Sequence, residues 1–243
     1  TIASSTVVNF IYGGKSNDGA VSDNQVTVSG STVGQSIYGG STGNGAAKNN
    51  QVTVVDSTVK QSIYGGISNN DAVCNNQVTI AGSTVGRLLY GGNSNSGEVS
   101  ENKVSVSDSE LNYEVYGGYS KNGDAKDNQL IIDRSTAKYD VHGACIENEG
   151  DASGNKTKIS NSNFDSFVYG AFTKIGSATQ NSLEIKDSCL NYTLLGAEVF
   201  EGNVTDNSVI LSNSIVNLYV TGAGTKIGNA ERNTVTISSC TVK

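Results

Sequence analysis

The chain has 243 residues, a formal net charge of −7 and 29 glycines, and it contains no proline, methionine or tryptophan. An acidic surface that is poor in basic residues argues against nucleic acid or an anionic membrane as the partner. No run of about 18 apolar residues is present, so we expect no membrane insertion by this chain.

Nearly the whole sequence is one segment written nine times. The Tyr-Gly-Gly motif recurs every 26 residues in the first five repeats, and the same slot continues with other residues. One spacing is 27 residues, and we expect a bulge or a lengthened loop in or near Cys145–Gly150. A fixed period of this length is typical of a solenoid or another repeat array.

Within the first complete repeat, Ser5–Gly30, apolar residues recur at Val7, Ile11 and Val21 before the segment Val26-Thr27-Val28. This last segment alternates apolar and polar residues, which is the pattern of a half-buried strand. Apolar clusters rich in β-branched residues predict two or three short strands per repeat around a narrow interior.

Helical periodicity is absent, and we predict an all-β fold, a parallel β-solenoid (β-helix) of nine 26-residue coils. At roughly 4.8 Å per coil the rod would be about 43 Å long. A right-handed coil is expected because parallel crossovers favour that hand. Residues 1–243 would form one domain, in which 1–118 follow the repeat closely and 119–243 diverge at outer positions, where solenoids carry their specific contacts.

An asparagine precedes the last strand segment in every repeat. Asparagine tolerates left-handed backbone and bonds to nearby backbone groups, and stacked amides can bond from coil to coil. We therefore predict a structural ladder formed by Asn24, Asn50, Asn76, Asn102, Asn128, Asn155, Asn181, Asn207 and Asn233. The recurrent glycines after the Tyr slot indicate positive φ or close backbone approach.

The Tyr slot predicts a column of stacked rings that stabilises neighbouring coils. Since Ile37 faces inward, Tyr38 faces outward, so we expect the column to be exposed. It is either structural or a flat stripe that binds a glycan or a host protein. Its members are Tyr12, Tyr38, Tyr64, Tyr90, Tyr116, His142 and Tyr169, followed by Leu195 and Thr221.

The sequence gives no reason to expect catalytic residues, a metal site or a cofactor. His142 is the only histidine, and it replaces tyrosine in the stack. Asp124 and Asp151 lie in similar loops of adjacent coils, where oxygen ligands for Ca²⁺ could gather. We favour a turn role for both, because the nonapeptide calcium repeat is absent.

The four cysteines are Cys74, Cys145, Cys189 and Cys240. The two in adjacent slots, Cys189 and Cys240, lie two coils apart, about 9.6 Å along the axis. Disulfide Cα atoms stay within about 7 Å, so we expect free thiols, buried or intermolecular. Asn191 and Asn203 stand in N-glycosylation patterns, as does Asn155 within the ladder.

Repeats such as SIYGGSTGNGAAKNNQVTVVDSTV and SIYGGISNNDAVCNNQVTIAGSTV resemble the YGG-type repeats of bacterial autotransporter passenger domains, which belong to large surface proteins of Gram-negative bacteria. The resemblance covers the full chain in register and is closest over Ser5–Gly118. It implies a secreted β-helix that is carried to the cell surface by a separate C-terminal domain and acts in adhesion.

Three functions are weighed. The preferred one is a non-catalytic adhesin or passenger stalk at the bacterial surface. The alternative is a subunit, mature or part of a longer array, that stacks head to tail into an extracellular fibre, because Thr1–Val8 and Thr236–Lys243 are the same part of the repeat and open ends expose strand edges. The residues expected to meet there are Thr1, Ile2, Val7, Ile237 and Val242. A polysaccharide-cleaving β-helix enzyme is least favoured, since it needs acids and bases clustered on one face.

Overall fold

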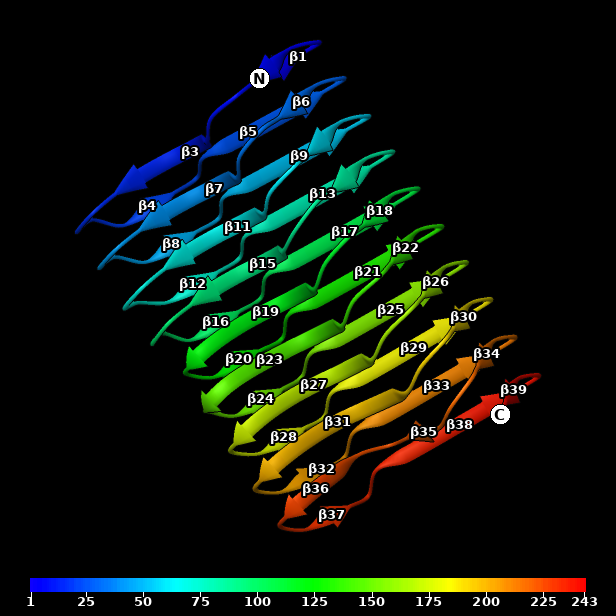
Figure 1. The fold of residues 1–243 in the computed structure, drawn as a ribbon. Coiled ribbons are helices and arrows are strands. Elements are labelled where there is room, and N and C mark those ends of the chain that lie inside the picture. The colour runs from blue at the N-terminus through cyan, green and yellow to red at the C-terminus, as the bar shows by residue number, and fades with distance from the viewer.

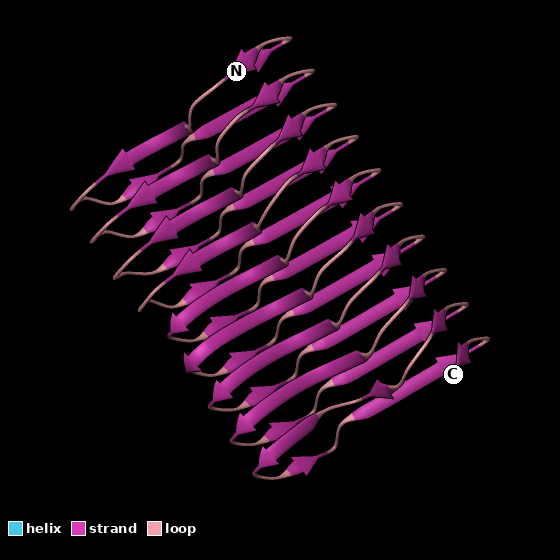
Figure 2. Ribbon diagram, viewed as in Figure 1, coloured by secondary structure: helices cyan, strands magenta, loops and turns pink.

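The computed structural model describes residues 1–243 and contains strands joined by short loops, with no helix (Figure 2). Each strand pairs in parallel with the strands one coil before and one coil after it. The coils stack into a straight rod with the two termini at opposite ends (Figure 1). The predicted parallel β-solenoid is confirmed, but each coil carries four strands instead of the two or three expected, because the Val21 slot forms a short strand of its own.

The first sheet has ten strands and contains the alternating segments that precede the corner to the second sheet. Its strands are β1 (Ile2–Ala3), β5 (Gln25–Ser29), β9 (Gln51–Val55), β13 (Gln77–Ala81), β17 (Lys103–Ser107), β21 (Gln129–Asp133), β25 (Lys156–Ser160), β29 (Ser182–Lys186), β33 (Ser208–Ser212) and β38 (Thr234–Ser238). The second sheet also has ten strands, each of two residues. They are β2 (Thr6–Val7), β6 (Thr32–Val33), β10 (Thr58–Val59), β14 (Thr84–Val85), β18 (Glu110–Leu111), β22 (Thr136–Ala137), β26 (Asn163–Phe164), β30 (Cys189–Leu190), β34 (Ile215–Val216) and β39 (Thr241–Val242).

The third sheet carries the Tyr slot. Its strands are β3 (Ile11–Ser16), β7 (Ile37–Thr42), β11 (Ile63–Ser68), β15 (Leu89–Ser94), β19 (Val115–Asn122), β23 (Val141–Glu149), β27 (Val168–Ile175), β31 (Leu194–Glu201), and then β35 (Val220–Thr221) and β36 (Gly224–Ile227), which both pair with β31. The fourth sheet has nine short strands, β4 (Val21–Ser22), β8 (Ala47–Lys48), β12 (Val73–Cys74), β16 (Val99–Ser100), β20 (Ala125–Lys126), β24 (Ala152–Ser153), β28 (Ala178–Thr179), β32 (Val204–Thr205) and β37 (Ala230–Glu231).

The core is a narrow apolar column enclosed by the first three sheets. Thirty buried residues form it, and members such as Val28, Val54 and Ile80 are fully buried. Each coil contributes the same slots, so burial is shared between neighbouring coils along the rod. Thr157 is the polar member of an otherwise apolar slot, and its hydroxyl is buried without a hydrogen-bond partner.

The one repeat of 27 residues produces the predicted irregularity near Cys145–Gly150. The register between β19 and β23 shifts after Ser120, and the register between β23 and β27 shifts after Ile146. The strand β23 is consequently the longest of its sheet, with nine residues. The insertion is therefore absorbed as a bulge within a strand, and the stacking continues beyond it.

Left-handed backbone is found one residue earlier than the ladder asparagines. Asp23, Asn49 and Asn75 have φ of 60°, 56° and 57°, whereas the asparagine that follows each of them does not have positive φ. The ladder asparagine is thus placed by its neighbour's turn. The glycines directly after the Tyr slot also lack positive φ. From Gly13 to Gly196, a Cβ at this position would overlap the carbonyl oxygen of the equivalent glycine in the next coil. Glycine is therefore needed here because the backbones of neighbouring coils approach closely.

Candidate functional site

The asparagine ladder is confirmed and runs through all nine coils. In its middle, the Asn102 Nδ2 donates to Asn128 Oδ1 at 3.1 Å and to the Val73 carbonyl at 2.9 Å. The Asn102 Oδ1 in turn accepts from the backbone N–H of Asn76 at 3.0 Å and from its Nδ2 at 2.9 Å. Seven members, from Asn50 to Asn207, are at most 1% exposed. Each amide therefore satisfies backbone groups that the corner leaves unpaired.

A second polar ladder, of serines, was not predicted. The backbone N–H of Ser57 donates to Ser83 Oγ at 3.0 Å, while Ser57 Oγ donates to the Val55 carbonyl at 2.7 Å. The same pattern recurs along the corner between the first and second sheets, at Ser5, Ser31, Ser57, Ser83, Ser109, Ser135, Ser162, Ser188 and Ser214, and ends on Cys240. The signal lay in the serine that recurs two residues before the apolar slot of the second sheet, with Cys240 as the one replacement.

The Tyr slot forms a continuous stack of seven rings. Neighbouring ring centroids from Tyr12 to Tyr169 are 4.7–5.0 Å apart, with interplanar angles of 4–14°. The spacing equals that of the coils, so the stack follows from the backbone repeat. The predicted stacking is confirmed.

The expected exposure of this stack is wrong for its later members. Tyr12 is 36% exposed, and Tyr38 and Tyr64 are half-buried, but the remaining members are 6–9% exposed: Tyr90, Tyr116, His142 and Tyr169. An outer layer of rings covers them. Tyr119 packs edge-on against Tyr90 and Tyr116, and Phe172 packs edge-on against His142 and Tyr169. A partner could therefore touch only the first three rings directly.

His142 is stacked between Tyr116 and Tyr169, and its Nδ1 is buried without a hydrogen-bond partner. Burial lowers the pKa of His142 to about 4, and nearby Asp140 opposes this shift only partly. The imidazole is therefore neutral at pH 7. Burial also raises the pKa of the adjacent Cys145 thiol, with the carboxylates of Glu114 and Glu147 adding to the effect. The Cys145 thiol is therefore protonated at neutral pH and is not in the nucleophilic thiolate form.

All four cysteines are free, as predicted; Cys145 is buried and the others are partly exposed. Asp124 accepts a backbone hydrogen bond from Asp151 at 2.9 Å and pairs with Lys126, which is the expected turn role. No group of three or more His, Cys, Asp or Glu side chains is placed to hold a metal ion. Of the glycosylation patterns, Asn155 is fully buried in the ladder, whereas Asn191 and Asn203 are exposed.

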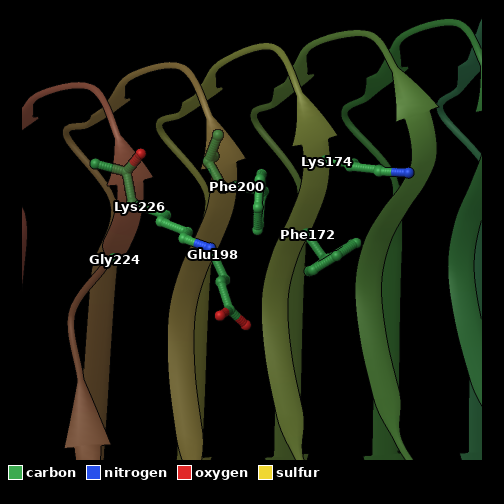
Figure 3. Close-up of a pocket in the computed structure, with 8 residues that line it drawn as sticks. Phe172, Lys174, Glu198, Phe200, Gly224 and Lys226 are labelled. Atoms are coloured by element: carbon green, nitrogen blue, oxygen red, sulfur yellow. The ribbon is translucent and has the colours of Figure 1, made fainter.

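A hollow of about 580 Å³ opens on the outer face of the third sheet, over β27, β31 and β36 (Figure 3). Residues of one outward column pair in the order Phe172, Glu198 and Gly224. A Cβ on Gly224 would meet no atom within 4 Å. The hollow therefore exists because this column, which carries large side chains in the preceding coils, ends on a glycine.

A neighbouring outward column forms the rim of the hollow. Phe200 is 45% exposed, and the Lys226 Nζ lies 4.4 Å from its ring centroid, within the range of a cation–π contact. In Figure 3, Lys226 reaches toward Phe200 and Glu198, while the amine of Lys174 points the other way. Burial raises the pKa of Glu198. The sequence analysis did not predict this hollow. Alignment of the 26-residue repeats would have shown its signal, which is Gly224 in a slot that holds a larger residue in the two preceding coils.

The two ends of the rod differ in exposure. At the C-terminal end, Ile237 and Val242 are 47% and 42% exposed, whereas their equivalents one coil earlier, Leu211 and Val216, are fully buried. At the N-terminal end, Thr1 is exposed, and Ile2 and Val7 are half-buried.

Comparison of the chain with protein-family models, curated proteins and solved structures gave no match in any of the three. No helix in the structure is long and apolar enough to cross a membrane.

Proposed function

We propose that this chain is a stiff, non-catalytic rod that displays its lateral surface outside a bacterial cell, as an adhesin or as the stalk of one. The observation that carries the proposal is uninterrupted stacking. Strand pairing and the asparagine ladder run the whole length, so outer side chains sit at fixed heights along one axis. Passage to the surface by an autotransporter route belongs to the same proposal and rests on the repeat resemblance.

The contact surface is assigned to the divergent half. Its interior slots keep their apolar character, while its outer slots change to aromatic and charged residues. Tyr192 and Tyr219 are 41% and 60% exposed there. Exposed aromatic rings with nearby polar groups are typical of surfaces that bind a glycan or a protein receptor.

The test is attachment of fluorescently labelled chain to host epithelial cells, with and without enzymatic removal of surface glycans. We expect saturable attachment that is weakened by Tyr192→Ser with Tyr219→Ser. Phe10→Ser is the matched control, since Phe10 is also exposed (49%) but lies in the near-consensus half. Absence of saturable attachment, or equal loss in the control, would contradict the proposal.

A second candidate is head-to-tail assembly into an extracellular fibre. It is favoured by the exposed apolar residues of the last coil and by the unpaired edge of β38. In such a stack β1 would pair with β38, and β2 with β39. The first and second sheets have strands at ten levels, whereas the fourth sheet has nine and so has the third, in which β35 and β36 share one level. The junction would therefore leave one strand missing in each of the third and fourth sheets.

Electron microscopy and sedimentation velocity over a concentration series test this candidate. Long filaments of even width that disappear on Ile237→Lys with Val242→Lys would support it. Short monomeric rods at every concentration would contradict it and leave the adhesin proposal ahead.

A further inference from the structure

The hollow beside Gly224 combines an apolar platform with a few polar groups. The rings of Phe172 and Phe200 form the platform (Figure 3), and Val199 is also among the lining residues. Its volume of about 580 Å³ lies within the range of about 300–1,000 Å³ that is usual for small-ligand sites. Because the backbone at Gly224 does not have positive φ, the glycine is not required by the turn. Its effect on the structure is the open space.

The charged groups at this hollow are not paired with each other. Neither Lys174 nor Lys226 forms an ion pair, although the Glu198 carboxylate lines the same hollow. Lys226 holds its ammonium group over Phe200, at the edge of the apolar platform. The lining thus carries two cations and one anion on a chain whose net charge is −7.

We infer that this hollow binds an acidic sugar residue of a glycan, with the sugar ring on Phe200 and Phe172, its carboxylate on Lys226, and its hydroxyls donating to Glu198. The C–H face of a pyranose matches an aromatic platform, and the ammonium group supplies charge complementarity to the acid. Lys174 also lines the hollow, but its amine points away from the place assigned to the sugar. The inference rests on the proposed role as a surface-displayed binding rod and names the ligand class of one site on it.

The test is calorimetric titration of the whole chain with tetragalacturonate and, separately, with its fully methyl-esterified form, which has the same rings without the charges. We expect the acid to bind and the ester to bind at least roughly tenfold more weakly. Gly224→Leu fills the hollow and should abolish binding. This variant should fold, because a leucine there enters open space and leucine suits a strand better than glycine.

The matched control is Ser41→Leu, which adds the same side chain in the same outward column but far from the hollow. It should bind as the unmodified chain does. Lys226→Gln should weaken binding of the acid several-fold and leave the ester unchanged, and raised salt should act in the same direction.

Equal binding of acid and ester, or full binding of the acid by Gly224→Leu, would overturn the inference. Absence of binding to both saccharides would overturn it as well. Cell attachment by the Gly224→Leu variant separates the two proposals. If the variant attaches normally while the chain binds no acidic sugar, the surface-rod proposal stands and only this site assignment fails.

Discussion

In the near-consensus half, strands of the third sheet such as β7 and β11 have six residues, whereas β27 and β31 in the divergent half have eight. The residue two places after the Tyr slot also differs, being glycine in the first five coils and alanine in the last four. Both halves nevertheless pair in the same register apart from the bulge at β23.

The two halves differ in the side chains that fill the end of each coil between the third and fourth sheets. In the near-consensus half a small polar residue points inward there, and the Ser68 hydroxyl donates to the Gly45 carbonyl of the preceding coil at 2.8 Å. In the divergent half Ile146 and Val199 occupy this slot and pack in a second apolar cluster, whereas Thr173 and Thr225 in alternate coils keep the hydroxyl bond to the preceding coil. The same backbone conformation is thus compatible with two kinds of inward side chain, one that bonds to a backbone carbonyl and one that packs against apolar neighbours.

The ladders and the main apolar column therefore fix the stacking of the coils, and the residues in the remaining slots are free to vary. The outer face changes most, since its side chains contact only their neighbours above and below. A rod of this kind can acquire a local feature, such as the hollow beside Gly224, without changing its stacking.

The largest expected effect concerns the ladder that both halves share. Asn102→Ala removes the side-chain acceptor of the Asn76 backbone N–H and of the Asn76 Nδ2, and it removes the Nδ2 donor to the Val73 carbonyl and to Asn128 Oδ1. Asn76, Val73 and Asn128 are all buried. Leaving several buried groups unsatisfied should lower the free energy of unfolding by about 3–5 kcal/mol. Urea unfolding followed by circular dichroism measures this.

Asn181→Ala, in the divergent half, should cost the same, because Asn181 is also fully buried and makes the equivalent bonds. Asn233→Ala in the last coil is the control and should cost about 1 kcal/mol, since Asn233 is itself partly exposed at the end of the ladder and water can take its place. A clearly smaller loss at Asn181 than at Asn102 would show that the halves do not share this element.

The next effect concerns His142, where the near-consensus stack passes into the divergent half. Above pH 6.5 the imidazole is neutral in both folded and unfolded chains and contributes nothing. As pH falls below about 6.5 the unfolded chain binds the proton first, because the folded pKa is about 4. Stability should therefore fall between pH 6.5 and 4, by about 2 kcal/mol at pH 5.

The control for this pH dependence is His142→Tyr, which restores the consensus ring between Tyr116 and Tyr169. Carboxylates titrate in both proteins, so the difference between their unfolding curves at each pH isolates the histidine. Parallel curves from pH 7 to pH 5 would show that His142 takes up its proton without opening the stack.

A smaller effect separates the two halves directly. A Cβ on Gly66 would lie 2.6 Å from the Asn76 Nδ2, so Gly66→Ala should disturb the ladder and cost about 1–3 kcal/mol. The reverse change, Ala197→Gly, removes one methyl group from the second cluster and frees the unfolded chain, and should cost about 1 kcal/mol. If Gly66→Ala proves neutral, the strand must already lie far enough from the ladder in both halves.

Much of the fold could be predicted because the period aligns nine equivalent residues in each slot. The inward Val and Ile slots, the asparagine ladder, the ring stack and the bulge near Cys145 all follow from that alignment. The burial of Tyr90 and Tyr116 did not, because Tyr119 covers both of them from an outer column whose packing depends on side-chain direction.

The left-handed sites were missed for a related reason. Their slot holds aspartate, asparagine or glycine in six of nine coils, which are the types that tolerate left-handed backbone. Glu101, Gln180 and Arg232 weaken this signal, and the slot beside it is asparagine in all nine coils. The stacking of neighbouring coils imposes this conformation whatever the residue. The hollow was not predicted because it depends on one glycine in an outer column, where side-chain size varies from coil to coil and follows no repeat.

The smallest expected effect is a gain in stability at these left-handed sites. Glu101 and Gln180 both have φ of 56° and both are exposed, and Gly154 occupies the same slot with φ of 66°. A left-handed conformation costs a non-glycine residue about 1–2 kcal/mol, and glycine returns about 0.4–1 kcal/mol of this through the freer unfolded chain. Glu101→Gly and Gln180→Gly should therefore each raise the free energy of unfolding by about 0.5 kcal/mol.

Asn49→Gly is the control for this gain, because asparagine already tolerates the left-handed region and has less strain to lose. Urea unfolding of the three variants should rank Glu101→Gly and Gln180→Gly equally, and both above Asn49→Gly. Equal gains in the two halves would mean that the backbone turn before the ladder is the same on both sides of the bulge. A gain in only one half would place the boundary between the halves in the backbone itself and not only in the side chains that cover it.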